Sequence, residues 1–211
     1  MSLREARGLY VLIDPEHTRG REPAAVARAA LAGGCAALQL RAKLLADGAL
    51  LALATRLGEL ARAAGVPFIV NDRADLALLA EADGLHLGQD DMPLASVRRI
   101  APQLVLGLST HSVAQASAGA RAGADLIAFG PIFETRSKLR PDPVVGLAAL
   151  AEVVRSVNVP VIAIGGLTLA NASEVARTGA RLGAVIGAVS EAEDPEQAAR
   201  ALHAALGGTP A

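Results

Sequence analysis

The 211-residue sequence is poor in aromatic residues, and this shortage excludes one class of partner. It contains no tryptophan, one tyrosine and three phenylalanines, which are too few to form a base-stacking surface for nucleic acid. The formal net charge is −1, and acidic and basic residues are interspersed, so no basic stripe is available to a phosphate backbone. We therefore expect no nucleic-acid partner.

Cysteine and long apolar runs are also scarce. Cys35 is the only cysteine, so the chain cannot form an internal disulfide, which favours a reducing compartment. Residues 1–10 lack the apolar segment of a signal peptide, and no uninterrupted apolar run approaches the ~20 residues that span a membrane. We expect a soluble cytoplasmic protein with no membrane partner.

Lysine is the rarest charged residue. The chain has 18 arginines but only two lysines, Lys43 and Lys138, beside many alanines, glycines and prolines, a composition typical of a high-GC coding bias. A lysine that is retained under such a bias is expected to do something that arginine cannot do. By contrast, Arg98 lies on a predicted helix and is expected to face solvent.

Apolar residues are abundant, at 52% of the chain, which allows a sizeable core. Eight short apolar runs predict strands at residues 9–13, 36–40, 67–70, 84–87, 104–108, 126–130, 160–164 and 183–187. The runs are continuous and do not alternate with polar residues, as is typical of parallel strands that are covered on both faces.

The segments between these runs have the signals of helices. Helix starts are predicted at Pro23, Pro93, Ser112, Thr168 and Asp194-Pro195-Glu196, and glycines at 33–34, 65, 123 and 179 mark helix ends. Eight strands that alternate with eight helices predict an α/β fold, a single (β/α)8 TIM barrel that spans residues 1–211 as one domain. A doubly wound open sheet is the alternative, but the chain lacks its glycine-rich first turn.

Polar and charged residues gather at the carboxyl ends of the predicted strands, where barrels of this class place their active sites. These strand ends comprise residues 13–14, 39–43, 71–73, 88–91, 109–112, 131–138, 165–166 and 186–187. The opposite strand ends are mostly glycine, proline and alanine. We therefore expect a shared cavity at the carboxyl end of the barrel.

Gln39, Arg41 and Lys43 are spaced two residues apart, so on an extended strand they point to one face. One amide and two cations suit a polyanion, because arginine binds phosphate through two parallel hydrogen bonds and lysine provides a point charge. The alternative is a solvated strand end with incidental charges.

Asp72 and Asp91 end consecutive predicted strands, so their carboxylates can approach each other. Two carboxylates together with substrate phosphate are the usual arrangement for Mg²⁺. Taken singly, each aspartate is better explained by capping of the following helix than by metal binding, with Asn71 as another candidate cap. The pairing across adjacent strands favours the metal, and Asp90 is interpreted as an exposed neighbour.

A second anion site is predicted at the last two strands. Gly165-Gly166 and Ile186-Gly187 end these strands, where backbone N–H groups of barrels bind phosphate. Close packing of strand and helix is the alternative. The segment Thr135-Arg136-Ser137-Lys138 lies in a long loop, and its hydroxyl groups and cations indicate a lid over phosphate.

The remaining polar candidates are less specific. Ser109 and His111 offer further hydrogen-bond donors, His86 is interpreted as a satisfied core residue, and His17 and His203 as surface residues. The sequence has no His/Cys metal cluster and no convincing nucleophile–base pair. The residues describe a barrel with two anion sites, which suits two phosphorylated substrates or one long one.

Six motifs in collinear order resemble the thiamine-phosphate synthase family: QLRAK (39–43), VNDR (70–73), GLHLGQDDMP (84–93), LGLSTHS (106–112), GPIFETRSK (130–138) and IAIGGLT (162–168). The resemblance covers nearly the whole chain. It implies a TIM-barrel transferase that joins 4-amino-2-methyl-5-(hydroxymethyl)pyrimidine diphosphate to a thiazole phosphate and releases pyrophosphate, with Mg²⁺ as cofactor.

The resemblance also implies roles for individual residues. It places the pyrimidine diphosphate on Gln39, Arg41, Lys43, Asn71, Ser109 and Lys138. It places the thiazole phosphate on Thr135, Ser137, Gly166, Ile186 and Gly187. Asp72 and Asp91 become the Mg²⁺ ligands, and Lys43, Ser109 and Lys138 the catalytic residues. No general base is required, because the electron-rich aminopyrimidine stabilises the cation that develops as pyrophosphate leaves.

The chain departs from the family pattern at three positions. Gly187 stands where the family often has serine, Glu134 where proline is common, and Ser137 where threonine is common.

The related thiazole tautomerase, an isomerase on the same barrel, is the alternative function, but the complete diphosphate-and-metal set favours the synthase. A regulatory barrel without catalysis would have lost charges at its strand ends, and none is lost. The sequence does not determine whether the chain forms a homo-oligomer.

Overall fold

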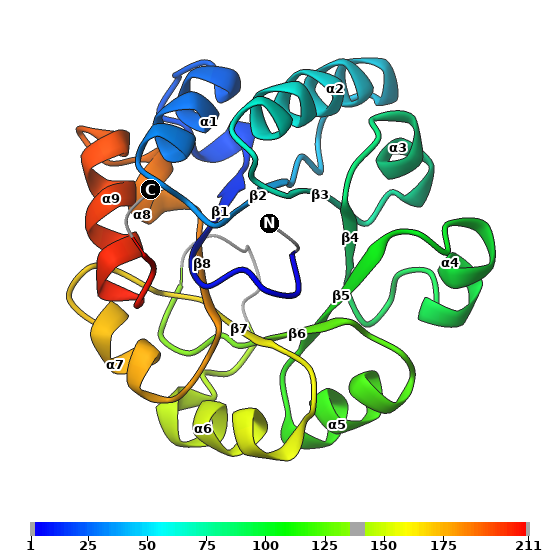
Figure 1. Cartoon of the computed structure of the whole chain (residues 1–211), viewed down its shortest axis with the longest axis vertical. Coiled ribbons are helices and arrows are strands. Elements are labelled where there is room, and N and C mark those ends of the chain that lie inside the picture. The colour runs from blue at the N-terminus through cyan, green and yellow to red at the C-terminus, as the bar shows by residue number, and fades with distance from the viewer. Residues whose placement is uncertain (1–2, 136–141, 210–211) are drawn as a thin grey trace.

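The computed structural model describes residues 3–135 and 142–209, and these form the predicted barrel (Figure 1). Eight parallel strands pair in chain order, and β1 closes on β8. Helices surround the strands on the outside (Figure 1). The (β/α)8 prediction is confirmed, and the open sheet is excluded because the sheet is closed.

The strands lie close to the predicted apolar runs. They are β1 (Gly8–Ile13), β2 (Ala37–Leu40), β3 (Phe68–Asn71), β4 (Gly84–Leu87), β5 (Val105–Thr110), β6 (Leu126–Phe129), β7 (Val161–Ile164) and β8 (Leu182–Val185). Only the last prediction extends well beyond its strand. The chain leaves the sheet at Ile186, and Gly187 begins a short helix.

The helices and one 3-10 turn occupy the segments between strands. They are η1 (Pro15–His17), α1 (Pro23–Ala32), α2 (Asp47–Ala63), α3 (Ala74–Leu79), α4 (Leu94–Ile100), α5 (Val113–Arg121), α6 (Gly146–Ser156), α7 (Ala172–Arg177), α8 (Gly187–Ser190) and α9 (Pro195–Ala205). Ser112 caps α5 as predicted, since its hydroxyl accepts the Gln115 N–H. The predicted start at Thr168 is wrong, because a turn precedes α7, in which Asn171 Oδ1 accepts the Thr168 N–H at 2.9 Å.

The core has two parts, and strand residues alternate between them. In β1, Leu9, Val11 and Ile13 pack into the layer between sheet and helices, whereas Tyr10 and Leu12 pack inside the barrel. Both layers are apolar, which explains why the strands appear in the sequence as continuous apolar runs. Cys35 lies in the outer layer, where burial raises the pKa of its thiol to about 12.

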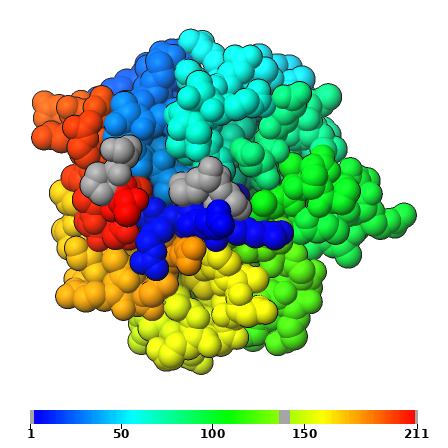
Figure 2. Space-filling view, viewed as in Figure 1, coloured from blue at the N-terminus to red at the C-terminus, as the bar shows by residue number. Residues whose placement is uncertain are grey.

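The amino-terminal segment covers one end of the barrel, as Figures 1 and 2 show. Leu3 and Ala6 are buried there, and Arg4 pairs with Asp125 at 2.6 Å. Arg98 donates to the same carboxylate at 2.8 Å and to the Leu104 carbonyl, so its side chain, which is 35% exposed, faces solvent only in part. Since this end is closed, a ligand must enter from the other end.

The prediction of a surface His203 is wrong, because the residue is only 7% exposed. Its Nδ1 accepts the Leu9 N–H at 3.3 Å, and its Nε2 lies 2.9 Å from the Thr209 carbonyl oxygen. Gly8 and Gly208 make room for the ring, since a Cβ at either position would lie within 3 Å of it. The histidine thereby ties α9 and the following residues to β1.

Within the described residues, no helix is both long and apolar enough to cross a membrane.

Candidate active site

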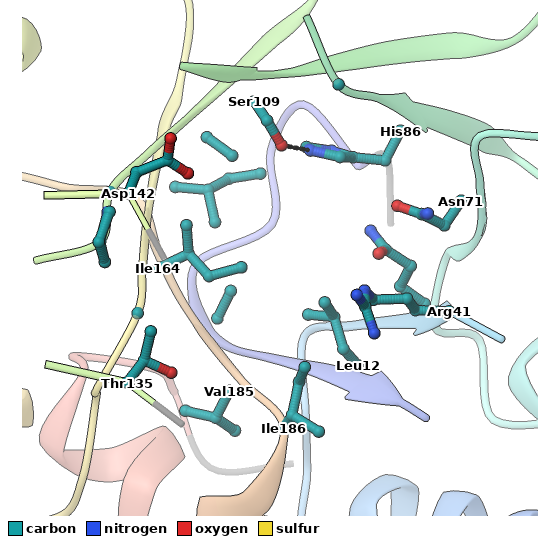
Figure 3. A pocket seen from close by; sticks show the side chains of 18 of the residues that line it. Leu12, Arg41, Asn71, His86, Ser109, Thr135, Asp142, Ile164, Val185 and Ile186 are labelled. Carbon is teal, nitrogen blue, oxygen red and sulfur yellow. Dashed lines mark hydrogen bonds between the residues drawn. The ribbon is translucent and has the colours of Figure 1, made fainter. Parts of the chain in front are cut away.

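A cavity of about 680 Å³ opens at the carboxyl ends of the strands (Figure 3). Every strand contributes to its wall. The cavity brings together all the described residues predicted to bind substrate or metal: Gln39, Arg41, Lys43, Asn71, Asp72, Asp91, Ser109, Thr135, Gly166, Ile186 and Gly187. Ser137 and Lys138 lie outside the described residues.

Gln39 lies deep in this cavity, on β2, and is only 2% exposed. Its Nε2 donates a hydrogen bond of 2.7 Å to the Tyr10 hydroxyl on β1. Burial raises the pKa of that hydroxyl well above its usual range, so Tyr10 stays neutral. The contact fixes the orientation of the Gln39 amide toward the interior of the barrel.

Arg41 follows β2 and is held from the side by Asp14. The strand register pairs Ile13 with Leu40, and the Arg41 N–H donates to the Ile13 carbonyl at 2.9 Å, so the next residues of the two strands lie side by side. The Arg41 guanidinium donates to the Asp14 carboxylate, which is fully buried. From the sequence, Asp14 was predicted at a strand end, but no role was predicted for it.

Lys43 and the two predicted metal ligands form a charged cluster. Lys43 Nζ lies 3.2 Å from Asp72 Oδ2, and the carboxyl groups of Asp72 and Asp91 are within hydrogen-bonding reach of each other. The pKa of Asp72 is raised, first by burial and then by the hydrogen bond with Asp91, while Lys43 acts in the opposite direction. Asp72 also has a left-handed backbone (φ 62°), a strained conformation that is common at functional sites.

The geometry does not support helix capping by these aspartates. Arg73 precedes α3 and Pro93 precedes α4, and neither helix start has a side-chain cap. The Asp91 carboxylate instead accepts the Gly88 N–H at 2.6 Å within its own loop. Among the described residues no group of three or more His, Cys, Asp or Glu side chains forms a metal cage. A pair of carboxylates suits Mg²⁺, which is usually bound by one or two carboxylates, phosphate and water.

His86 faces the same cavity from β4. It is buried, as predicted, and its Nε2 lies 2.9 Å from Ser109 Oγ (Figure 3). Gly107 gives the ring its space, because a Cβ there would lie 2.5 Å from His86 Nδ1. Gln89 Nε2 donates to the Ser109 carbonyl at 2.6 Å. The hydrogen-bond partner of the Ser109 hydroxyl is therefore His86, which the sequence analysis had interpreted only as a core residue.

His111 links β5 to the loop before α6. Its Nδ1 lies 2.5 Å from the Gly130 carbonyl oxygen and its Nε2 lies 3.4 Å from Asp142 Oδ2. The Gln115 side chain accepts the His111 N–H at 2.7 Å. Asp142 lines the cavity but was missed, since nothing in its sequence surroundings distinguishes it from an ordinary loop acid.

The predicted second phosphate site lies on a different part of the wall. Figure 3 shows Thr135 and Ile186 across the cavity from Asn71. Gly166 has a left-handed backbone (φ 69°), and a Cβ there would lie 2.3 Å from the Glu134 carbonyl oxygen. The close packing at this glycine is therefore against the loop after β6, and not between strand and helix as the alternative explanation expected. Gly166 also lines the cavity, so its predicted role toward phosphate stays open.

Charged side chains at the strand ends and glycines after the last two strands are typical of barrel enzymes that act on phosphorylated small molecules. Comparison with known proteins narrows this class. The family model described as thiamine monophosphate synthase matches residues 9–189. The chain belongs to this family.

Individual relatives agree with the family model. A thiamine-phosphate synthase of Anaeromyxobacter dehalogenans is 49% identical over 206 residues, covering 96% of this chain and 90% of its own. One of Roseiflexus castenholzii is 49% identical over 198 residues, covering 93% and 87%. The solved structure of a thiamine phosphate pyrophosphorylase from Pyrococcus furiosus has a TM-score of 0.89 and 37% identity, and the match covers 98% of each chain. The chain is accordingly a thiamine-phosphate synthase in function, a transferase of thiamine biosynthesis.

Proposed function

We propose that the cavity binds 4-amino-2-methyl-5-(hydroxymethyl)pyrimidine diphosphate and a thiazole phosphate together, and that the transfer requires Mg²⁺. The observation that carries this proposal is the cluster of Arg41, Lys43, Asp72 and Asp91 within one cavity that also contains Gly166 and Gly187. One part of the wall suits a diphosphate with its metal, and the other suits a phosphate monoester.

Asp72 and Asp91 would hold the Mg²⁺. The pKa of Asp72 is raised first by burial and then by the neighbouring Asp91 carboxyl, because two adjacent carboxylates repel each other when both are ionised. When bound, Mg²⁺ supplies charge neutralisation on the leaving pyrophosphate. Lys43, at 3.2 Å from Asp72, is close enough to contact the same diphosphate.

The other residues orient the reacting parts. Gln39 is fixed at the cavity floor, where it can donate or accept at the pyrimidine ring, with Asn71 beside it. Ser109 can donate its hydroxyl proton near the leaving group in the tautomer in which the His86 Nε2–H donates to Ser109 Oγ. Bringing the thiazole nitrogen close to the exocyclic carbon supplies most of the remaining rate enhancement. No general base is needed.

The thiazole phosphate would be held by Thr135, Gly166, Ile186 and Gly187, which line the cavity. Ser137 is assigned to the same phosphate and Lys138 to the diphosphate, both by family resemblance. Lys43, Ser109 and Lys138 are the residues assigned to catalysis. The partners are small molecules, and we assign a cytoplasmic location because a single cysteine leaves no internal disulfide that would indicate an oxidising compartment.

The metal assignment is tested by Asp72→Asn and Asp91→Asn. Each substitution preserves shape but leaves one carboxylate to hold the cation, so turnover should fall at least about tenfold at limiting Mg²⁺ while the fold is kept. The measurement is thiamine phosphate formation as a function of Mg²⁺ concentration.

Asp90→Asn is the matched control for this pair. Asp90 is adjacent in sequence, and the substitution removes the same charge from an exposed side chain. It should keep the wild-type Mg²⁺ dependence. If Asp72→Asn and Asp91→Asn also keep it, the carboxylate pair does not hold the metal.

A further inference from the structure

Asp14 is a charged residue with an unusual position. It directly follows β1, its side chain is fully buried, and it is not among the residues that line the cavity. Its Oδ1 accepts the Glu16 N–H at 3.1 Å, and its Oδ2 accepts a hydrogen bond from Arg41 Nη1. A buried carboxylate is costly unless it is paired, and here the pairing partner is a side chain of the candidate active site.

The strand register makes this pairing local and specific. The Arg41 N–H donates to the Ile13 carbonyl, so the residue after β1 and the residue after β2 are neighbours. The Arg41 side chain is 16% exposed, and it lines the cavity. Its guanidinium has five N–H donors in a rigid fork, so a bond from Nη1 to Asp14 sets the direction of the remaining donors.

We infer that Asp14 is a positioning residue that orients the Arg41 guanidinium toward the diphosphate before the substrate arrives. This inference rests on the proposed role of Arg41 in diphosphate binding. An arginine side chain has many rotamers, and fixing it in advance removes part of the entropic cost of binding. Asp14 therefore tightens diphosphate binding although it has the same sign of charge as the ligand.

The sign of the effect separates this role from a purely electrostatic one. If the negative charge of Asp14 acted mainly on the ligand, its removal would tighten pyrophosphate binding. If Asp14 only stabilised the fold, its removal would lower the melting temperature and weaken both substrates alike. If Asp14 positions Arg41, its removal should weaken the binding of the diphosphate and leave the binding of the thiazole phosphate unchanged.

The test uses inorganic pyrophosphate at fixed Mg²⁺ as the probe, with binding measured by calorimetry. Asp14→Asn keeps a side-chain oxygen that can accept the Glu16 N–H but removes the charge that holds Arg41. We expect pyrophosphate binding to weaken about tenfold and the KM for the pyrimidine diphosphate to rise, with the KM for thiazole phosphate unchanged. In an Arg41→Gln background, Asp14→Asn should add nothing further.

Asp125→Asn is the matched control at the other end of the barrel. Asp125 is also a shielded carboxylate paired with an arginine, Arg98, at 2.8 Å, and it accepts the Leu106 N–H. Its substitution should lower the melting temperature and leave pyrophosphate binding unchanged.

Unchanged or tighter pyrophosphate binding in Asp14→Asn would overturn the inference, as would a further loss in the Arg41→Gln background. Wild-type pyrophosphate binding by Arg41→Gln alone would reject the proposed role of Arg41, which is a separate failure. Nitrogen-15 NMR of the wild-type arginine side chains tests the same point without the Asp14 variant. The signal of the Arg41 guanidinium is identified by its disappearance in Arg41→Lys. If Asp14 holds this group, the signal should show hindered rotation before any ligand is added. Free rotation in the ligand-free protein would contradict the positioning role of Asp14.

Discussion

Asp72 is the proposed metal ligand whose pKa is shifted by its surroundings. Its pKa is raised by burial and by Asp91, and Lys43 offsets this only in part. A carboxyl whose pKa is higher in the folded than in the unfolded chain stabilises the fold fully below the unfolded value of about 4. That contribution is lost as the pH rises through the folded value.

This gives a prediction for the metal-free protein. As the pH rises from about 4 through the raised pKa of Asp72, wild type should lose stability relative to Asp72→Asn, which has no carboxyl to ionise there. The measurement is the melting temperature of both proteins against pH in the presence of a chelator. Added Mg²⁺ should restore stability to wild type at the upper end of this range and have little effect on the variant. If the melting temperatures of the two proteins change in parallel with pH, the pKa of Asp72 is not raised in the folded protein.

The two lysines supply another prediction at the residue level. Lys43 Nζ lies 3.2 Å from Asp72 Oδ2. On the proposed function, we expect a compact ammonium to fit there beside the diphosphate and its metal better than a larger planar guanidinium. Lys43→Arg and Lys138→Arg keep the charge, yet each should lower kcat/KM at least about tenfold, or ~1.4 kcal/mol of transition-state stabilisation. Steady-state kinetics with both substrates checks this.

The control for the lysine variants is Arg99→Lys on α4. Arg99 is exposed, whereas Arg98 donates to Leu104 and Asp125 and cannot serve. Arg99→Lys should cost almost nothing. Two fully active Lys→Arg variants would mean that the scarcity of lysine is coincidental, even though the family assignment would stand.

The short helix α8 contains one of the three departures that the sequence analysis noted from the resembled family. Gly187 is its first residue, and a Cβ there would lie 3.2 Å from the Glu191 carboxyl carbon, the end of a flexible side chain. Gly187→Ser should therefore be accommodated, and its hydroxyl should lower the KM for thiazole phosphate without much change in kcat, since it adds uniform binding. A raised KM would indicate that the hydroxyl donates to Glu191 instead.

Element positions were predictable where local physics decides them. Strands buried on both faces appear as apolar runs, and Pro23, Ser112 and Asp194 mark helix starts because each sets or satisfies the first helical turn. His203 was misplaced because its burial depends on Gly8 and Leu9, which are distant in sequence and meet the ring only when β1 and α9 pack together. Thr168 was misassigned because an intervening turn, closed by Asn171, delays the helix.

At the scale of the whole molecule, the barrel itself explains why the site was largely predictable. The carboxyl ends of the parallel strands all border one cavity, so residues at or just after these strand ends, such as Arg41, Asp72 and Ser109, meet there whatever their distance in sequence. Contacts between loops follow no such rule. The bonds of Asp14 to Arg41 and of His111 to Asp142 depend on register and loop path, which sequence patterns do not determine.

The most direct test of the account is the reaction itself. The purified protein is incubated with the pyrimidine diphosphate, thiazole phosphate and Mg²⁺, and both products are quantified by chromatography, with each component omitted in turn. Thiamine phosphate and pyrophosphate should appear in equal amounts, and only when all three components are present. Failure to form thiamine phosphate in the complete mixture, or equal formation after Mg²⁺ is removed by a chelator, would contradict the account.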